Sequence, residues 1–165
     1  MSEPFSKQFL ATSPEELPDL KTVLGMSGLE FMQKILTGEI ARPPISGILD
    51  YWLDTVEDGV VIFRGTPDFA HTNPVGTVHG GWYGTLLDSA MACAVMTKVP
   101  KGSVYTTLEY KVNITRPIPL GTQIIARGEV QHAGRSTGVS NGTITGVEDG
   151  KLYATGSTTC IIMKP

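Results

Sequence analysis

The segment that most constrains this fold is an almost wholly apolar stretch that follows a His-Gly-Gly step at residues 79–81. From Gly80 to Thr97, its one carboxylate is Asp88. A run this apolar is typical of a buried helix or a membrane span, and an ionised group inside it is costly unless it is solvated, paired or used in chemistry. The stretch therefore predicts a central helix with one functionally important acid.

Length and composition set the frame for this helix. The chain has 165 residues, of which 41% are hydrophobic, enough for one domain with a sizeable core. Its net charge is −3 and its Lys and Arg residues are scattered, so a nucleic-acid partner is not expected. The N-terminus shows no basic start followed by an apolar run, and the longest apolar run contains an acid and hydroxyl groups. We therefore expect a cytoplasmic protein that binds neither nucleic acid nor membrane.

The first 46 residues differ from the rest because they are rich in Pro, Ser and acidic residues. One helix is predicted there, with a capping pattern that begins at Ser27 and a terminating Gly38. Its apolar residues recur on one side, which predicts that the helix lies on the main domain. The Arg-Pro-Pro sequence at 42–44 is expected to start an extended chain. We divide the chain into an N-terminal extension, residues 1–46, and a main domain, residues 47–165.

Short runs of alternating or β-branched residues predict strands from residue 48 onward. The predicted strands are residues 48–56, 60–64, 104–115, 121–132, 135–147 and 151–163. Turn signals at Ala133-Gly134 and Asp149-Gly150 join the last three strands, which are therefore antiparallel. The sequence predicts an α+β fold in which one long helix lies among five or six strands.

Small residues gather on one face of the strand predicted at 135–147. Gly138, Ser140, Gly142 and Gly146 have even spacings and so share that face. A face without bulky side chains must be approached closely by another part of the structure or by a ligand. We interpret the close neighbour as the buried helix, with a bound ligand as the alternative.

Several reaction classes lack their motifs here. The sequence has no Walker loop, no Gly-x-Gly-x-x-Gly and no Cys-x-x-Cys. Its three histidines do not show metal-ligand spacing. No cofactor and no metal are therefore expected.

The apolar helix itself carries the remaining candidates for chemistry. Gly80 and Gly81 leave the free N–H groups and the positive end of the helix dipole accessible, an arrangement that polarises a carbonyl oxygen. The alternative is that these glycines only permit close packing. Asp88, in the third turn, is a candidate general base toward water or nucleophile toward an acyl group. Its alternative is a buried acid bonded to a hydroxyl such as that of Thr85.

The distance between these two features predicts a shared site. Eight residues of helix separate Gly80 from Asp88, which corresponds to about 12 Å. A base-held water and an oxyanion donor must both lie within roughly 3 to 3.5 Å of the reacting atoms. If both groups act on one carbonyl, they come from two subunits whose helices meet antiparallel across a two-fold axis.

Three motifs occur together in the main domain. They are Asn73-x-x-Gly76-x-x-His79-Gly80-Gly81 with Asp88 nine residues after the histidine, Tyr105-Thr-Thr107-Leu-Glu109 continuing to Arg116-Pro117, and Gly134-Arg135. As a set they resemble the hotdog-fold acyl-CoA thioesterases of the phenylacetate-pathway type, over roughly residues 47–163. The resemblance implies a long helix wrapped by an antiparallel sheet, and dimers with shared sites that usually pair into tetramers. It does not explain the N-terminal extension.

The resemblance also implies residue roles. The Gly80 N–H is expected to hold the thioester oxygen, Asp88 to activate or perform the attack, and Asn73 and His79 to shape the oxyanion side. Thr107 falls where relatives place a hydroxyl near the attacking water, although a shift of one residue would select Thr106 instead.

Further positions are expected to bind the rest of the substrate. Arg116 and Arg135 fall where relatives bind the phosphates of coenzyme A, with solvated strand ends as the alternative. Gly81 is expected beside coenzyme A. An apolar acyl pocket is expected to be lined by Trp82, Tyr83 and Tyr105, with part of the N-terminal segment as a further candidate.

The expected activity is hydrolysis of an aromatic or medium-chain acyl-CoA to the free acid and coenzyme A by a homotetramer. Coenzyme A is then part of the substrate, not a cofactor. Two alternatives stay open: a hotdog dehydratase or hydratase that acts on acyl thioesters, and a non-catalytic acyl-CoA-binding protein.

Overall fold

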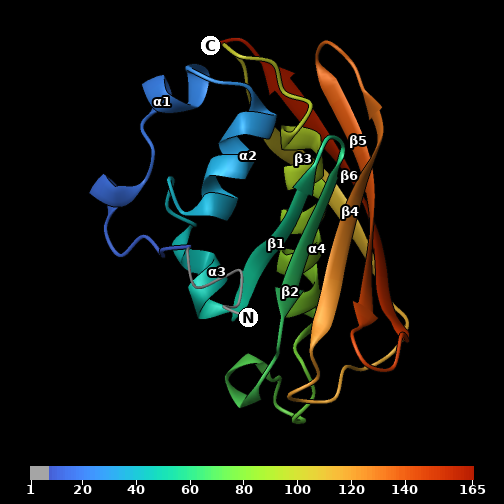
Figure 1. Cartoon of the computed structure of the whole chain (residues 1–165). Helices are drawn as coiled ribbons and strands as arrows, with labels where there is room; N and C mark the ends of the chain where they lie inside the picture. Colours follow the sequence, from blue (N-terminus) through green and yellow to red (C-terminus); the bar gives the residue numbers. More distant parts are fainter. Residues whose placement is uncertain (1–7) are drawn as a thin grey trace.

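One long helix packed on a six-stranded antiparallel sheet forms the centre of the computed structural model, which describes residues 8–165 (Figure 1). The helices are α1 (Leu20–Leu24), α2 (Gly28–Thr37), α3 (Pro44–Ile48) and α4 (Gly80–Met96). The strands are β1 (Tyr51–Glu57), β2 (Val60–Gly65), β3 (Val104–Ile114), β4 (Ile124–Ala133), β5 (Thr137–Gly146) and β6 (Leu152–Met163). The predicted α+β fold is confirmed, with six strands.

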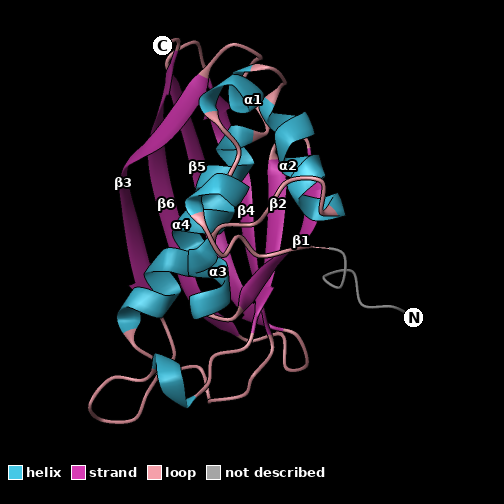
Figure 2. Cartoon of the chain, turned by 90° about the vertical axis from the view of Figure 1, so that its left-hand side faces the viewer, coloured by secondary structure: helices cyan, strands magenta, loops and turns pink. Residues whose placement is uncertain are grey.

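The sheet has the order β1-β2-β4-β5-β6-β3, so β1 and β3 are its edges. Helix α4 packs on one face of the sheet, and α1, α2 and α3 lie on that same side (Figure 2). Helix α2 contacts both β1 and α4. No helix within residues 8–165 combines the length and the hydropathy needed to cross a bilayer.

Helix α4 is the centre of the hydrophobic core because it is apolar around most of its circumference. Six of its side chains have no exposed surface: Leu86, Leu87, Ala90, Met91, Ala94 and Val95. The sheet covers one side of the helix and α2 lies beside it, so the long apolar run of the sequence is buried without a membrane.

The small residues of β4 and β5 allow α4 to approach the sheet closely. A Cβ atom at Gly142 would lie 2.7 Å from Cγ of Met91, and one at Gly138 would overlap Val95. At Gly128 of β4, a Cβ atom would overlap the backbone carbonyl of Ala90. The predicted interpretation of the small-residue face, close contact with the buried helix, is therefore confirmed.

Edge strand β3 contains a bulge. Thr107 pairs with Cys160 and Glu109 pairs with Thr159, so Leu108 has no partner in the β3–β6 register. Strand residues normally alternate between the two faces, and an extra residue reverses that alternation. This reversal lets side chains on both sides of the bulge face α4.

One side of α4 follows β3 along its length. Asp88 lies against Thr107, with a hydrogen bond between their side chains. Gly84 lies beside Tyr110, and Gly80 lies beside Ile114. We call Gly80, Gly84 and Asp88 the β3-facing stripe, since the spacing of four residues places them on one side of the helix.

The N-terminal extension follows the prediction in one part and departs from it in another. Ser27 caps α2 by accepting a hydrogen bond from the Glu30 N–H at 3.3 Å, and Gly38 ends the helix with a φ of 81°. The Arg-Pro-Pro sequence does not start an extended chain: Pro44 begins α3, and β1 starts only at Tyr51. Proline has a fixed φ that suits the first position of a helix, which explains the short helix there.

Replacing Gly128 by Ala should lower the free energy of unfolding by about 1–3 kcal/mol, because the Ala90 backbone cannot yield as a side chain would. The neighbouring Arg127→Ala is the control, since it removes only an exposed ion pair with Glu129. Urea unfolding of both variants checks the expectation. An unfolding free energy for Gly128→Ala equal to that of the wild type would contradict the packing described here.

Candidate active site

The first turn of α4 exposes one free backbone donor. His79 is the N-cap, and its Nδ1 accepts a hydrogen bond from the Gly81 N–H at 2.8 Å. The Trp82 N–H donates to the His79 carbonyl at 3.0 Å. Within residues 8–165, the Gly80 N–H has no hydrogen-bond acceptor. The capping histidine thus engages the Gly81 amide and leaves the Gly80 amide for a ligand, with the positive end of the helix dipole behind it.

An open hollow of about 350 Å³ lies at this helix start. Asn73, Gly80, Tyr83 and Arg116 contribute to its lining, so three of the predicted site residues and one predicted pocket residue meet there. The Asn73 side chain is already engaged in its own loop: its Oδ1 accepts from the Thr77 N–H at 3.2 Å, and its Nδ2 donates to the Thr77 hydroxyl at 2.8 Å. Asn73 therefore shapes the hollow by fixing the loop that borders it.

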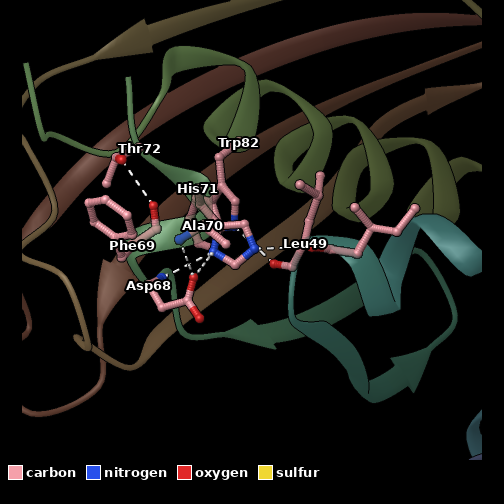
Figure 3. Close-up of polar contacts among 8 residues, drawn as sticks. Leu49, Asp68, Phe69, Ala70, His71, Thr72 and Trp82 are labelled. Carbon is pink, nitrogen blue, oxygen red and sulfur yellow. Dashed lines mark hydrogen bonds and ion pairs between the residues drawn. The ribbon is translucent and has the colours of Figure 1, made fainter. Parts of the chain in front are cut away.

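A buried histidine that the sequence analysis did not single out anchors the loop before α4 (Figure 3). Nδ1 of His71 accepts from the Asp68 N–H at 3.0 Å, which assigns the ring proton to Nε2, and Nε2 donates to the Ile48 carbonyl at 3.1 Å. The His71 carbonyl accepts from the His79 N–H at 2.8 Å. With both ring nitrogens engaged, His71 positions the helix start.

Trp82 and Tyr83 differ in their surroundings, although both side chains are buried. The Trp82 indole N–H donates to the Leu49 carbonyl at 2.9 Å (Figure 3). The Trp82 ring packs edge-on against the Tyr83 ring. Trp82 does not line the hollow at the helix start, and its role in an acyl pocket stays a prediction. Tyr83 borders the hollow at the helix start, and its hydroxyl accepts from the Ile118 N–H at 2.8 Å.

Asp88 lies half-buried in the third turn of α4, bonded to β3. The Thr107 hydroxyl donates to Oδ1 of Asp88 at 3.0 Å, whereas Thr106 is exposed and the Thr85 hydroxyl donates to the Gly81 carbonyl instead. Burial raises the pKa of the Asp88 carboxyl above its ordinary value, and the Thr107 hydrogen bond acts in the opposite direction because it favours the ionised form. A carboxylate with a raised pKa is a stronger base than an exposed one, as general-base chemistry requires.

The structure does not bring all of the predicted site residues together in one chain. Gly80 and Asp88 are separated by eight helical residues, about 12 Å. Arg116 borders the hollow at the start of α4, whereas Arg135 lies in the β4–β5 hairpin, next to strand residues that cover Val95 at the opposite end of α4. Both arginine side chains are exposed.

The potential metal ligands in the described part of the chain are dispersed. Across residues 8–165, no three His, Cys, Asp or Glu side chains are grouped closely enough to hold a metal ion. The two cysteines, Cys93 and Cys160, are both free. Burial raises the pKa of the Cys93 thiol to about 12, so this thiol stays protonated at neutral pH.

Comparison with known proteins accounts for this arrangement. The family model described as "Thioesterase superfamily" matches residues 75–153, a segment that contains α4, Asp88 and Thr107. Over this segment the chain is similar to the superfamily. The chain is 29% identical over 86 residues to mouse "Acyl-coenzyme A thioesterase 13". That match spans 52% of this chain and 61% of the mouse protein, less than two thirds of its length.

Solved structures agree with this similarity. A phenylacetic acid degradation-related protein from Ralstonia eutropha is 29% identical and has a TM-score of 0.72, with 79% of this chain and 98% of that chain covered. A hypothetical thioesterase from Streptococcus pneumoniae, solved with coenzyme A, is 26% identical with a TM-score of 0.65, covering 73% and 91% of the two chains. The hotdog fold and the resemblance to thioesterases expected from the sequence are confirmed.

Replacing Thr107 by Val should raise the pKa of Asp88 further, because the variant keeps the branched shape but loses the hydrogen bond that favours the ionised carboxylate. A titration of the Asp88 side-chain carbon signal by NMR measures this pKa directly. Thr106→Val, one residue away on the exposed face, should leave it unchanged. An unaltered Asp88 titration in Thr107→Val would rule out Thr107 as the hydroxyl that tunes this acid.

Proposed function

We propose that this protein hydrolyses acyl-CoA thioesters to the free acid and coenzyme A, with Gly80 and Asp88 as the catalytic pair. The observation that carries the proposal is the β3-facing stripe: a free glycine amide at a helix start and a half-buried, hydroxyl-bonded acid on the same side of one helix. These are the donor and the base that attack on a carbonyl needs. The matched relatives are named as acyl-CoA thioesterases, which supports coenzyme A as the thiol.

The proposed reaction uses each group once. The Gly80 N–H donates a hydrogen bond to the thioester oxygen and stabilises the negative charge that develops on it. In one route Asp88 takes a proton from water as the water oxygen bonds to the carbonyl carbon, and the carbon–sulfur bond then breaks. In the other route an Asp88 oxygen bonds to that carbon, the carbon–sulfur bond breaks to leave an anhydride, and water then opens the anhydride. In both routes the coenzyme A thiolate takes up a proton. Thr107 holds the Asp88 carboxylate in place.

Two copies of the chain complete the site in this proposal. Within one chain, Gly80 and Asp88 lie too far apart for one carbonyl, and Arg116 and Arg135 lie near opposite ends of α4. Antiparallel helices from two subunits would place the start of one helix beside the middle of the other, and would bring an Arg135 toward the partner's helix start. Both arginines then become candidates for the coenzyme A phosphates.

The edge of the sheet offers the surface for this dimer. Strand β3 pairs with β6 on one side only, and an unpaired edge is a template for another strand. Its large side chains are exposed: Leu108 by 59%, Ile114 by 49% and Tyr110 by 47%. The β3-facing stripe lies directly behind this edge, so a dimer formed here contains both halves of the proposed site. Pairing of two such dimers would give the expected tetramer.

Asp88→Asn should lower turnover about 100-fold or more, because the amide keeps the shape but cannot act as base or nucleophile. The variant should be at least as stable as the wild type at neutral pH. Since folding raises the pKa of Asp88, its ionisation costs stability above the folded pKa, and this cost is lost as pH falls through that pKa or when the charge is deleted.

Release of free thiol from acyl-CoA, with a thermal melt of each protein, measures both effects. Asp58→Asn is the matched control, because Asp58 is an exposed acid paired with Lys98 far from the stripe. Near-normal thiol release by folded Asp88→Asn protein would rule out a catalytic role for Asp88. Absence of thiol release by the wild type would favour the dehydratase or the non-catalytic binding protein.

Mixed dimers test the shared site. Asp88→Ala removes the acid and Gly80→Pro removes the backbone donor, so each variant alone should be nearly inactive. Proline is acceptable at position 80: it is the first helical residue, and His79 before it has a φ of −63° and a ψ of 139°, a conformation that precedes proline readily.

Equal amounts of the two variants should regain roughly a quarter of wild-type activity after subunit exchange. Half of the dimers are then mixed, and each mixed dimer has one intact site of two. Native mass spectrometry confirms the exchange and thiol release gives the activity. If mixed dimers form and the mixture stays inactive, the two residues do not serve one site across an interface.

A further inference from the structure

A largely apolar cavity of about 260 Å³ lies between the N-terminal extension and the main domain. The extension contributes more than half of its lining residues, among them Phe31, Met32 and Ile35 of α2 and Ala41 after it. The main domain contributes the opposite wall from β1, β2, β3 and α4. The segment that matches the family model begins at residue 75, so the lining residues of the extension lie outside the matched segment.

The cavity begins at the turn of α4 that bears Asp88. Ser89 and Cys93 of α4 line it, as does Tyr105 of β3, which lies two residues before Thr107 on the same face of the strand. The charge of Asp88 contributes to the raised pKa values of Tyr105 and Cys93, which places its carboxyl close to this wall. A thioester positioned at Asp88 therefore has this cavity beside it.

Four polar side chains that line the cavity, those of Arg42, Ser46, Tyr51 and Ser89, already have hydrogen-bond partners. The Tyr51 hydroxyl and the Ser89 hydroxyl share a hydrogen bond of 2.9 Å. Arg42 donates to the Ser46 hydroxyl at 3.2 Å and to the Tyr51 carbonyl at 3.0 Å, and Ser46 donates to the Pro43 carbonyl at 2.8 Å. A polar group brought into this space would lose water without gaining an equivalent partner, which is unfavourable. The lining therefore selects an apolar occupant.

The volume limits the size of that occupant. An apolar protein cavity of about 150 Å³ accommodates benzene, which has six carbon atoms. On that scale, a cavity of 260 Å³ holds an apolar group of about eight to ten carbon atoms. Both an octanoyl and a phenylacetyl group have a suitable size.

We propose that this cavity receives the acyl group of the substrate and that the N-terminal extension sets the accepted length, at about eight to ten carbon atoms. The inference rests on the proposed function, because it needs a thioester at Asp88. It assigns the extension a role in substrate specificity and leaves the chemistry to the main domain.

A second hollow explains how the length limit is imposed. It lies toward Leu20, Val23 and Val104 and shares four lining residues with the acyl cavity: Pro18, Phe31, Met96 and Tyr105. Side chains that line both spaces stand between them. Of these four, the large aromatic ring supplied by the extension is Phe31, so we assign Phe31 as the end wall of the acyl cavity.

Two substitutions in the extension should move the length preference in opposite directions. Ala41→Leu places three more carbon atoms in the cavity and should shift the best substrate to an acyl chain about two to three carbons shorter. Phe31→Ala opens the cavity into the second hollow and should shift it to a chain at least about four carbons longer. Leu36→Ala is the control, since Leu36 packs on the core from the same helix but lines neither space.

The measurement is kcat/KM for thiol release from straight-chain acyl-CoAs with acyl groups of about two to sixteen carbons. Phenylacetyl-CoA and adipoyl-CoA are tested as additional substrates. The wild type should prefer octanoyl-, decanoyl- or phenylacetyl-CoA over acetyl- and palmitoyl-CoA by at least about tenfold. A preference for acetyl-CoA, or for adipoyl-CoA with its charged end, would overturn the apolar assignment. An unchanged length profile in folded Ala41→Leu and Phe31→Ala would overturn the role of the extension, while the proposed function stands.

A binding measurement on the wild-type protein needs neither catalysis nor a variant. Titration with decanoate should shift the NMR methyl signals of Met32 and Met96, which line the cavity, and not that of Met91, which faces the sheet. If the methyl signals of Met32 and Met96 shift in a protein that releases no thiol, the proposed function is rejected. The cavity is then a site that binds the apolar chain of a carboxylic acid. Decanoate that leaves Met32 and Met96 unshifted at saturation of its site would reject the cavity.

Discussion

The contact between the backbone of α4 and the glycines of the sheet is the constraint on which the other features depend. Gly128 faces the Ala90 carbonyl, and Gly142 faces Met91, so helix and sheet approach more closely than larger side chains would permit. At this distance Thr107, on the edge strand, reaches the Asp88 carboxylate, and Tyr110 reaches Gly84. The same packing excludes water from one side of Asp88, and burial is the main reason that its pKa is raised.

The sequence predicted the parts of the fold that rest on strong local patterns. A long apolar run after a His-Gly-Gly step indicated α4, and even spacing of small residues on β5 indicated the face that receives the helix. Gly80 and Asp88 could be chosen because a bare helix start and a lone acid are unusual in such a run. The choice between Thr106 and Thr107 could not be made, because it depends on the bulge at Leu108, and a bulge leaves no reliable trace in the alternation of one strand.

Other features were missed for physical reasons. Pro44 was interpreted as the start of an extended segment, yet proline is equally suited to begin a helix. His71 had one available signal: Asp68 three residues before it forms a capping box with it. The cavity under the extension depends on tertiary packing and has no sequence signature.

The bulge in β3 makes one position of this strand expendable. Because Leu108 pairs with nothing in the register and points to the exposed surface, a chain that lacks it keeps Thr107 opposite Cys160 and Glu109 opposite Thr159. A deletion anywhere else in the strand would turn Glu109 and Lys111 toward the helix, or turn Thr107 away from it. Length variation in this edge is therefore confined to a single residue, which marks where homologous strands of different length should be aligned.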